Sequence, residues 1–119
     1  MKSNLVSRIA AGLFGIVMAV FGVNHLMHAA DIAGYVPEFL PAHLFFVYLT
    51  GLAFLLAGVS FLLNIKVKLS GYLLGLLLVV IVCSIHLPHL LKGDASALTM
   101  VLKDTGLAAA AFFIGSKGL

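Results

Sequence analysis

The chain has 119 residues, of which 63% are hydrophobic and 9% are charged, with a formal net charge of +3. Soluble domains carry about 25% charged residues, so this composition excludes an ordinary soluble domain and indicates an integral membrane protein. The positive charge comes from basic residues beside apolar runs and gives no indication of nucleic-acid binding. The single cysteine, Cys83, excludes an intrachain disulfide and a dithiol redox centre within one chain.

Four apolar runs predict the fold. About 20 apolar residues are needed to cross a hydrocarbon core about 30 Å thick, and four runs reach or nearly reach that length. The predicted spans are residues 5–30, 44–63, 69–91 and 97–115. We therefore expect an all-α protein, a single domain over residues 1–119 that forms a bundle of four transmembrane helices.

The first run begins like a secretory signal peptide, with Lys2 and Arg8 before an apolar stretch. It is longer than a typical signal core and lacks a small-x-small cleavage pattern, so we interpret it as a membrane helix. Gly12, Gly15 and Gly22 form a row of small residues that would allow another helix to approach closely.

The end of the first run is polar. Four residues there lie three or four positions apart and so share one helical face: Asn24, His25, His28 and Asp31. Pro37 and Pro41 then break the helical pattern, and the chain is expected to turn back.

The second and third runs carry further small residues. Gly51 and Gly58 lie seven positions apart on one face, and the third run opens with the spacing Gly71-x-x-x-Gly75, which is typical of helix packing in membranes. These rows predict a tight bundle. For the fourth run, Asp94 and Ser96 are alternative N-caps.

The basic residues predict the orientation. Five fall at one end of an even-numbered bundle: Lys2, Arg8, Lys66, Lys68 and Lys117. The other end has Lys92 and, slightly further inside, Lys103. The positive-inside rule therefore predicts that both termini of a multi-pass membrane protein are cytoplasmic.

The acids and histidines fall in the opposite, outer half. Their positions are Asp31, Glu38, Asp94, Asp104, His25, His28, His43, His86 and His89. From a rise of about 1.5 Å per residue, His25 lies about 9 Å inside, His86 about 7 to 8 Å and Asp104 about 12 Å. Ionisable groups in a membrane usually face the bundle interior. We therefore predict a polar pocket, with these candidate ligand-binding residues: Asn24, His25, His28, His86 and Asp104.

Lys103 and Asp104 are adjacent, so their side chains leave a helix about 100° apart and are not expected to face one cavity together. Asp104 is expected to face inward. Lys103 either extends to the outer surface or turns in to neutralise Asp104 or Asp31, and the sequence leaves both arrangements open.

The spacing His-x-x-His occurs twice, at His25/His28 and at His86/His89. Facing pairs would hold a transition metal through four nitrogens, or through fewer nitrogens and a carboxylate from Asp31 or Asp104. The alternative is that these are interfacial histidines bonded to carbonyls and water. Pro88 lies within the second pair and is expected to disturb its helical geometry.

A second hypothesis places a quinone or other small organic ligand in the pocket. His25 or His86 would bind a carbonyl and exchange a proton. The apolar walls would come from five aromatic residues: Phe21, Phe39, Phe45, Phe46 and Tyr48. The alternative for the last three is anchoring at the membrane boundary. Cys83 is either a further ligand or a small core residue.

Four segments resemble the DoxX family of small bacterial membrane proteins. They are Phe21–His25, with the sequence Phe-Gly-Val-Asn-His, then Tyr35–Pro41, Val47–Gly51 and His86–Pro88. The resemblance covers nearly the whole chain. It implies a four-helix bundle of the bacterial inner membrane and an association with redox chemistry, and it assigns no catalytic residue.

The leading functional hypothesis is an accessory redox subunit that binds a quinone or another small ligand. An enzyme acting alone is less favoured, since the sequence has no dithiol and no nucleotide-binding fingerprint. The alternatives are a small proton-coupled transporter and a structural subunit of a membrane complex. The expected partners are the lipid bilayer and either a second copy of the chain or a larger redox complex.

Overall fold

The structure is a computed structural model that describes residues 5–118 and is helical throughout. The elements are α1 (Leu5–Met27), α2 (Ala29–Ala33), α3 (His43–Leu63), α4 (Val67–Ile81), the π-helical turn η1 (Val82–His86), α5 (Leu87–Leu91) and α6 (Ser96–Lys117). No strand occurs within the described range, so the predicted all-α class is confirmed.

Four helical segments are long and apolar enough to cross a membrane. They are Leu5–Met27, His43–Leu63, Val67–Leu91 and Ser96–Lys117, and the third combines α4, η1 and α5. The chain is therefore a small multi-pass membrane protein. The first segment ends three residues before the predicted boundary, because His28 leaves the helical region with φ −122° and ψ 32°.

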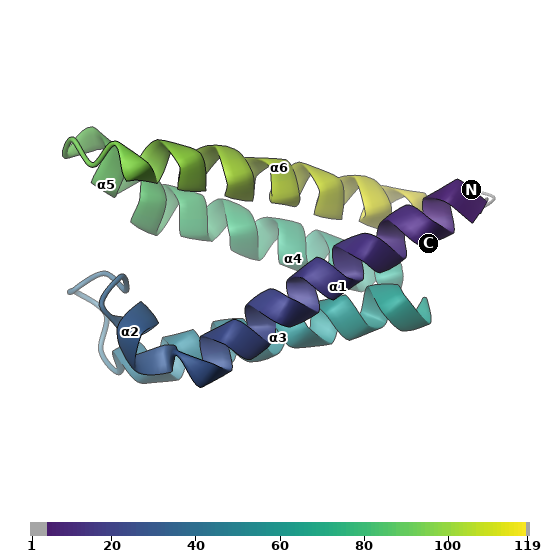
Figure 1. Cartoon of the computed structure of the whole chain (residues 1–119), viewed down its shortest axis with the longest axis horizontal. Coiled ribbons are helices and arrows are strands. Elements are labelled where there is room, and N and C mark those ends of the chain that lie inside the picture. Colours follow the sequence, from purple (N-terminus) through teal and green to yellow (C-terminus); the bar gives the residue numbers. More distant parts are fainter. Residues whose placement is uncertain (1–4, 119) are drawn as a thin grey trace.

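The helices form two pairs. α1 packs along α3 and α4 packs along α6, and α3 and α4 join the pairs. Figure 1 shows the pairs lying close together at the end that holds both termini and separating toward α2 and α5. One apolar core is built from all four spanning helices: Ala11, Met18, Phe54, Ala57, Phe61, Val67, Leu74, Leu78, Ala108, Ala111 and Ile114.

Glycines bring the backbones of α1 and α3 together. A methyl group added to Gly22 would lie 2.6 Å from the backbone nitrogen of Leu55 and 2.7 Å from the carbonyl oxygen of Gly51. At Gly15 it would lie 2.7 Å from the carbonyl oxygen of Gly58. Only a residue without a Cβ permits such an approach, which membrane helices use in place of hydrophobic attraction.

Gly12 does not belong to this contact, contrary to the prediction. A methyl group added there would meet nothing within 4 Å. At about 100° per residue, Gly22 lies about 20° from Gly15 around the helix, whereas Gly12 lies about 60° from Gly15 and so at the edge of the contacting face.

A second contact of the same kind joins α4 to α6. A methyl group added to Gly71 would lie 2.6 Å from Cα of Gly115, and one added to Gly75 would lie 2.8 Å from the ring of Phe112. The predicted Gly71-x-x-x-Gly75 spacing is therefore a packing row, and α6 is its partner.

A tight turn connects the two pairs between α3 and α4. Asn64 and Lys66 both adopt left-handed backbone conformations, with φ 57° and 51°. The backbone N–H of Ile65 donates to the carbonyl oxygen of Ser60 at 3.0 Å, and the Ser60 hydroxyl donates to the carbonyl of Ile65. The turn is thus held from both sides.

The start of α6 is stabilised by Asp94. Its Oδ1 accepts hydrogen bonds from the backbone nitrogen of Ser96 at 3.1 Å and from the Ser96 hydroxyl at 2.6 Å. The N-cap itself is Ala95, so neither predicted residue occupies that position, and Asp94 binds Ser96 from the residue before it. These bonds hold the pKa of the Asp94 carboxyl below its ordinary value, because they favour the ionised form.

The glycine contacts predict unequal effects of alanine. Gly22→Ala should lower the free energy of unfolding by about 1 to 3 kcal/mol, because its methyl group meets backbone atoms that cannot move aside. Gly106→Ala is the matched control, since nothing lies within 4 Å of the added methyl group. Unfolding in mixed detergent micelles, followed by circular dichroism, measures both. Equal losses would contradict the proposed role of the contact.

The capping bonds predict a pH-dependent stability. Because the pKa of folded Asp94 is lowered, its contribution is complete above the unfolded pKa of about 3.9 and is lost as the pH falls through the folded value. Asp94→Ala should therefore lower the melting temperature at neutral pH, with a smaller effect in acid. Asp94→Asn keeps a capping acceptor and should remove only the pH dependence. An alanine effect that is constant across the titration would be inconsistent with this account.

Candidate functional site

Asp104 is the only buried charged residue among those the structure describes, with 6% of its surface exposed. It lies in the first half of α6, within a membrane-spanning segment. The prediction that Asp104 faces inward is confirmed. A buried carboxylate in a membrane needs partners, because desolvation of an unpaired charge is costly.

Two basic side chains contact this carboxylate. Nε2 of His86 lies 3.1 Å from Oδ2 of Asp104, and Nζ of Lys103 lies 3.4 Å from Oδ1. Of the two arrangements that the sequence left open for Lys103, the structure has the inward one. The Lys103 side chain stays 39% exposed while its ammonium reaches the carboxylate, because a long stem can follow the helix surface.

The network extends to α1 through an aromatic ring. Nζ of Lys103 lies 4.8 Å from the centroid of the Phe21 ring, within range of a cation–π interaction. We call His86, Asp104, Lys103 and Phe21 the His86 network. It links α1, η1 and α6, and so connects the two helix pairs inside the membrane.

The position of His86 follows from Pro88. Proline lacks an N–H, and its ring would clash with the carbonyl of Ser84 in a regular α-helix. The chain instead forms the π-helical turn η1, in which the N–H of Leu87 donates to the carbonyl of Val82. The predicted disturbance by Pro88 is thus a π-turn, a feature often found at functional sites.

The π-turn changes the direction in which His86 projects. Gly71 faces α6. In a continuous α-helix of about 3.6 residues per turn, the residue four turns later on the same face would be residue 85. The extra residue in η1 moves His86 toward that face instead, and its imidazole reaches Asp104 on α6.

His25 and His89 use their rings differently. Nδ1 of His25 donates to the carbonyl of Phe21 at 2.8 Å, and Nδ1 of His89 donates to the carbonyl of Ile85 at 2.6 Å. Each therefore bonds to its own helical turn. The His25 ring also packs edge-on against Phe54, with centroids 5.1 Å apart, which places it between α1 and α3.

His86 has one ring nitrogen available. Its Nε2 faces the Asp104 carboxylate, which accepts a hydrogen bond and so favours the tautomer with the proton on Nε2. Nδ1 then carries a lone pair. No described residue bonds to it, and no buried side-chain nitrogen or oxygen in residues 5–118 lacks a partner, so Nδ1 reaches the molecular surface.

The structure does not assemble the four histidines that the sequence suggested as metal ligands. Within residues 5–118, no three His, Cys, Asp or Glu side chains are placed to hold a metal ion. His28 lies just after the end of α1. In the second pair, His86 bonds to Asp104, whereas His89 bonds to the carbonyl of Ile85. Asn24 and His28 are exposed at the end of α1 and take no part in the His86 network.

The aromatic residues do not form one wall. Phe21 joins the His86 network, whereas Phe39 is 81% exposed and Phe45 and Tyr48 are also exposed. Exposure of this kind suits side chains that face lipid or headgroups. Cys83 is exposed as well, so it is not the core residue that the sequence offered as one alternative.

The sequence analysis missed two contacts near this end. One is the ammonium of Lys103 over Phe21. The other lies between the α2–α3 connection and α5: the rings of Tyr35 and His89 have centroids 6.1 Å apart. Neither pair has a spacing that could reveal it, because each joins segments that are distant along the chain.

Comparison with known proteins does not identify the site. No protein-family model, curated protein or solved structure matches this chain. The function is therefore inferred from the geometry of the His86 network. It provides an imidazole inside a membrane, oriented by a buried carboxylate, with one nitrogen free to accept a hydrogen bond.

Proposed function

We propose that this chain binds a quinone-type ligand from the bilayer and serves as an accessory subunit in membrane redox chemistry. The observation that carries the proposal is the contact between Nε2 of His86 and the buried carboxylate of Asp104. A hydroxyl or carbonyl headgroup needs one oriented polar partner at the edge of the hydrocarbon, and His86 has the chemistry to supply it.

Each residue of the His86 network has a separate role in this proposal. Nδ1 of His86 accepts a hydrogen bond from a quinol hydroxyl, and a protonated His86 donates one to a quinone carbonyl. Asp104 fixes the tautomer and stabilises the imidazolium. The ammonium of Lys103, 3.4 Å from Oδ1, provides the carboxylate with a second partner of opposite formal charge.

The ligand approaches from the lipid. Two shallow pockets lie at the opposite end of the bundle, and neither includes a residue of the His86 network. Quinones partition into the bilayer, so a headgroup can reach the surface-accessible Nδ1 while its tail stays among lipid chains. This arrangement requires no enclosed cavity.

The accessory role rests on the resemblance to the DoxX family and on what the chain lacks for independent redox catalysis. Its single cysteine cannot form a dithiol. Electron transfer would therefore take place in a partner protein, and this chain would hold or deliver the ligand.

We also propose that both termini face the cytoplasm. Among the described residues, Arg8, Lys66, Lys68 and Lys117 lie at the end of the bundle with the termini, whereas Lys92 and Lys103 lie toward the other end. Lys2, which entered the sequence argument, is outside the described residues. The excess of basic residues at the first end supports the orientation.

Substitution of His86 should weaken quinone binding. We expect His86→Ala to raise the dissociation constant of a short-chain benzoquinone about tenfold or more, as for loss of a hydrogen bond of about 1.4 kcal/mol. Asp104→Asn should have a smaller effect, because the ring remains but loses its charged partner. Titration of the purified protein in detergent, with binding followed by calorimetry, measures both.

His43→Ala is the matched control, since it removes an imidazole at the same end of the bundle but outside the His86 network. It should leave the dissociation constant within about twofold. Circular dichroism spectra establish that the variants remain helical. If folded His86→Ala protein binds the quinone as tightly as the unsubstituted protein, the network is structural only.

The orientation predicts the outcome of reporter fusions. A fluorescent protein that folds only in the cytoplasm should be bright when attached at the C-terminus. Alkaline phosphatase, which is active only outside the cytoplasm, should be active when inserted after Gly93 in the turn before α6 and inactive at the C-terminus. The reverse pattern would show that the bundle is inverted.

A further inference from the structure

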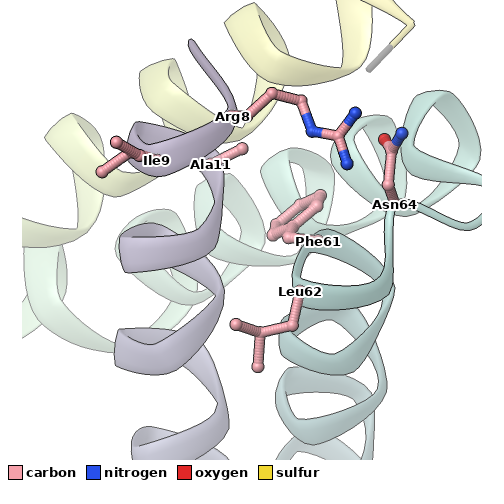
Figure 2. A pocket seen from close by; sticks show the side chains of 6 residues that line it. All are labelled: Arg8, Ile9, Ala11, Phe61, Leu62 and Asn64. Atoms are coloured by element: carbon pink, nitrogen blue, oxygen red, sulfur yellow. The ribbon is translucent and has the colours of Figure 1, made fainter. Parts of the chain in front are cut away.

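A pocket lies at the end of the bundle that is opposite to the His86 network. It has a volume of about 220 Å³ and opens between the start of α1 and the end of α3. Six residues line it: Arg8, Ile9, Ala11, Phe61, Leu62 and Asn64. Figure 2 shows the Arg8 side chain extending from α1 past the Phe61 ring toward the amide of Asn64.

The pocket combines polar donors with an apolar floor. The guanidinium of Arg8 presents five N–H donors in a planar fork that matches phosphate, and the Asn64 amide adds two more donors. Phe61, Leu62 and Ile9 provide the apolar side. This is the division of chemistry found where a phospholipid headgroup meets its acyl chains.

Arg8 has no carboxylate partner among the described residues. Within residues 5–118, the ion pairs are those of Asp104 with His86 and with Lys103, at the other end of the bundle. All four acids of the chain fall in the α1–α3 connection, in the turn before α6 or in the first half of α6. Three further basic side chains belong to the helix ends at this side of the bundle: Lys66, Lys68 and Lys117.

Asn64 is fixed in place by the turn that follows α3. Its left-handed conformation, with φ 57°, ends the helix, and its N–H donates to the carbonyl of Ser60. Asparagine tolerates this conformation better than most residues. The turn therefore places Asn64 among the residues that line the pocket, and Figure 2 shows its amide near the Arg8 side chain.

The depth of the pocket matches a headgroup. Arg8 is three residues after the first residue of α1, a helix of 23 residues, which spans about 35 Å at about 1.5 Å per residue. The hydrocarbon core is about 30 Å thick. The start of α1 and the end of α3 therefore lie at the boundary between hydrocarbon and headgroups.

From these observations, we propose that Arg8 and Asn64 form a binding site for the phosphate of an anionic phospholipid. The volume is below the range of about 300–1,000 Å³ that encloses whole small ligands, so the pocket takes the headgroup phosphate and the chains remain in the bilayer against Ile9 and Leu62. The site is separate from the His86 network, and its test is independent of quinone binding.

The test is lipid titration of the full-length protein in a neutral detergent. Short-chain phosphatidylglycerol, short-chain phosphatidylcholine and inorganic phosphate are the three probes, and native mass spectrometry counts the bound molecules. We expect phosphatidylglycerol to bind at least about tenfold more tightly than phosphatidylcholine, and inorganic phosphate to show no binding, because it lacks the apolar part.

Arg8→Gln should weaken phosphatidylglycerol binding about tenfold or more, as for loss of a charge-assisted hydrogen bond. Lys68→Gln is the matched control, since it removes the same charge at the same end but outside the pocket; it should change binding by less than about threefold. Arg8→Lys keeps the charge, and a clear loss of affinity in that variant identifies the fork as the binding element. Asn64→Gly keeps the left-handed turn and removes only the amide.

Two results would overturn the proposal. Equal weakening by Arg8→Gln and Lys68→Gln would show general attraction of anionic lipid to a basic surface. Binding of inorganic phosphate as tightly as phosphatidylglycerol would identify a site for a free anion instead. Melting temperatures of the variants without added lipid distinguish a folding defect from lost binding, and Arg8→Lys remains informative if Arg8→Gln does not fold.

Discussion

Close contact between backbones at glycine is the constraint on which this structure depends. Helices in a bilayer gain little from hydrophobic attraction, because lipid is as apolar as their own side chains. α1 is joined to α3 at Gly15 and Gly22, and α4 is joined to α6 at Gly71. The second contact sets the rotation of α4 and α6 about their axes. The extra residue in η1 then brings His86 to Asp104 on α6.

The His86 network solves an electrostatic problem that these contacts create. Packing α6 against α4 buries the Asp104 carboxylate, and a lone charge there would destabilise the bundle. Lys103 on α6 and His86 on η1 contact the carboxylate. The ammonium of Lys103 also lies over the ring of Phe21 on α1. Lys103 and Asp104 carry opposite formal charges, and such pairing suits a low-dielectric surrounding.

Much of the fold could be predicted from the sequence, because apolar length and glycine spacing depend on local pattern alone. The inward position of Asp104 was also predictable from its depth in an apolar helix. The partners of the histidines were not, since the choice between a carbonyl of the same helix, as for His25, and a distant carboxylate, as for His86, depends on helix rotation. Gly12 was misassigned for a related reason: a short glycine spacing does not by itself specify which face meets a neighbour.

The π-turn at Val82–His86 divides the third membrane segment into two parts with separate rotational phases. The part before it packs on α6 at Gly71 and Gly75, and the last residue of the turn, His86, contacts Asp104 on α6. The extra residue changes the rotation of the helix between its two parts. Substitutions at or after His86 can therefore alter the polar contacts and leave the glycine contacts of α4 unchanged. Such a segment can acquire a new polar function while the assembly of the bundle is preserved.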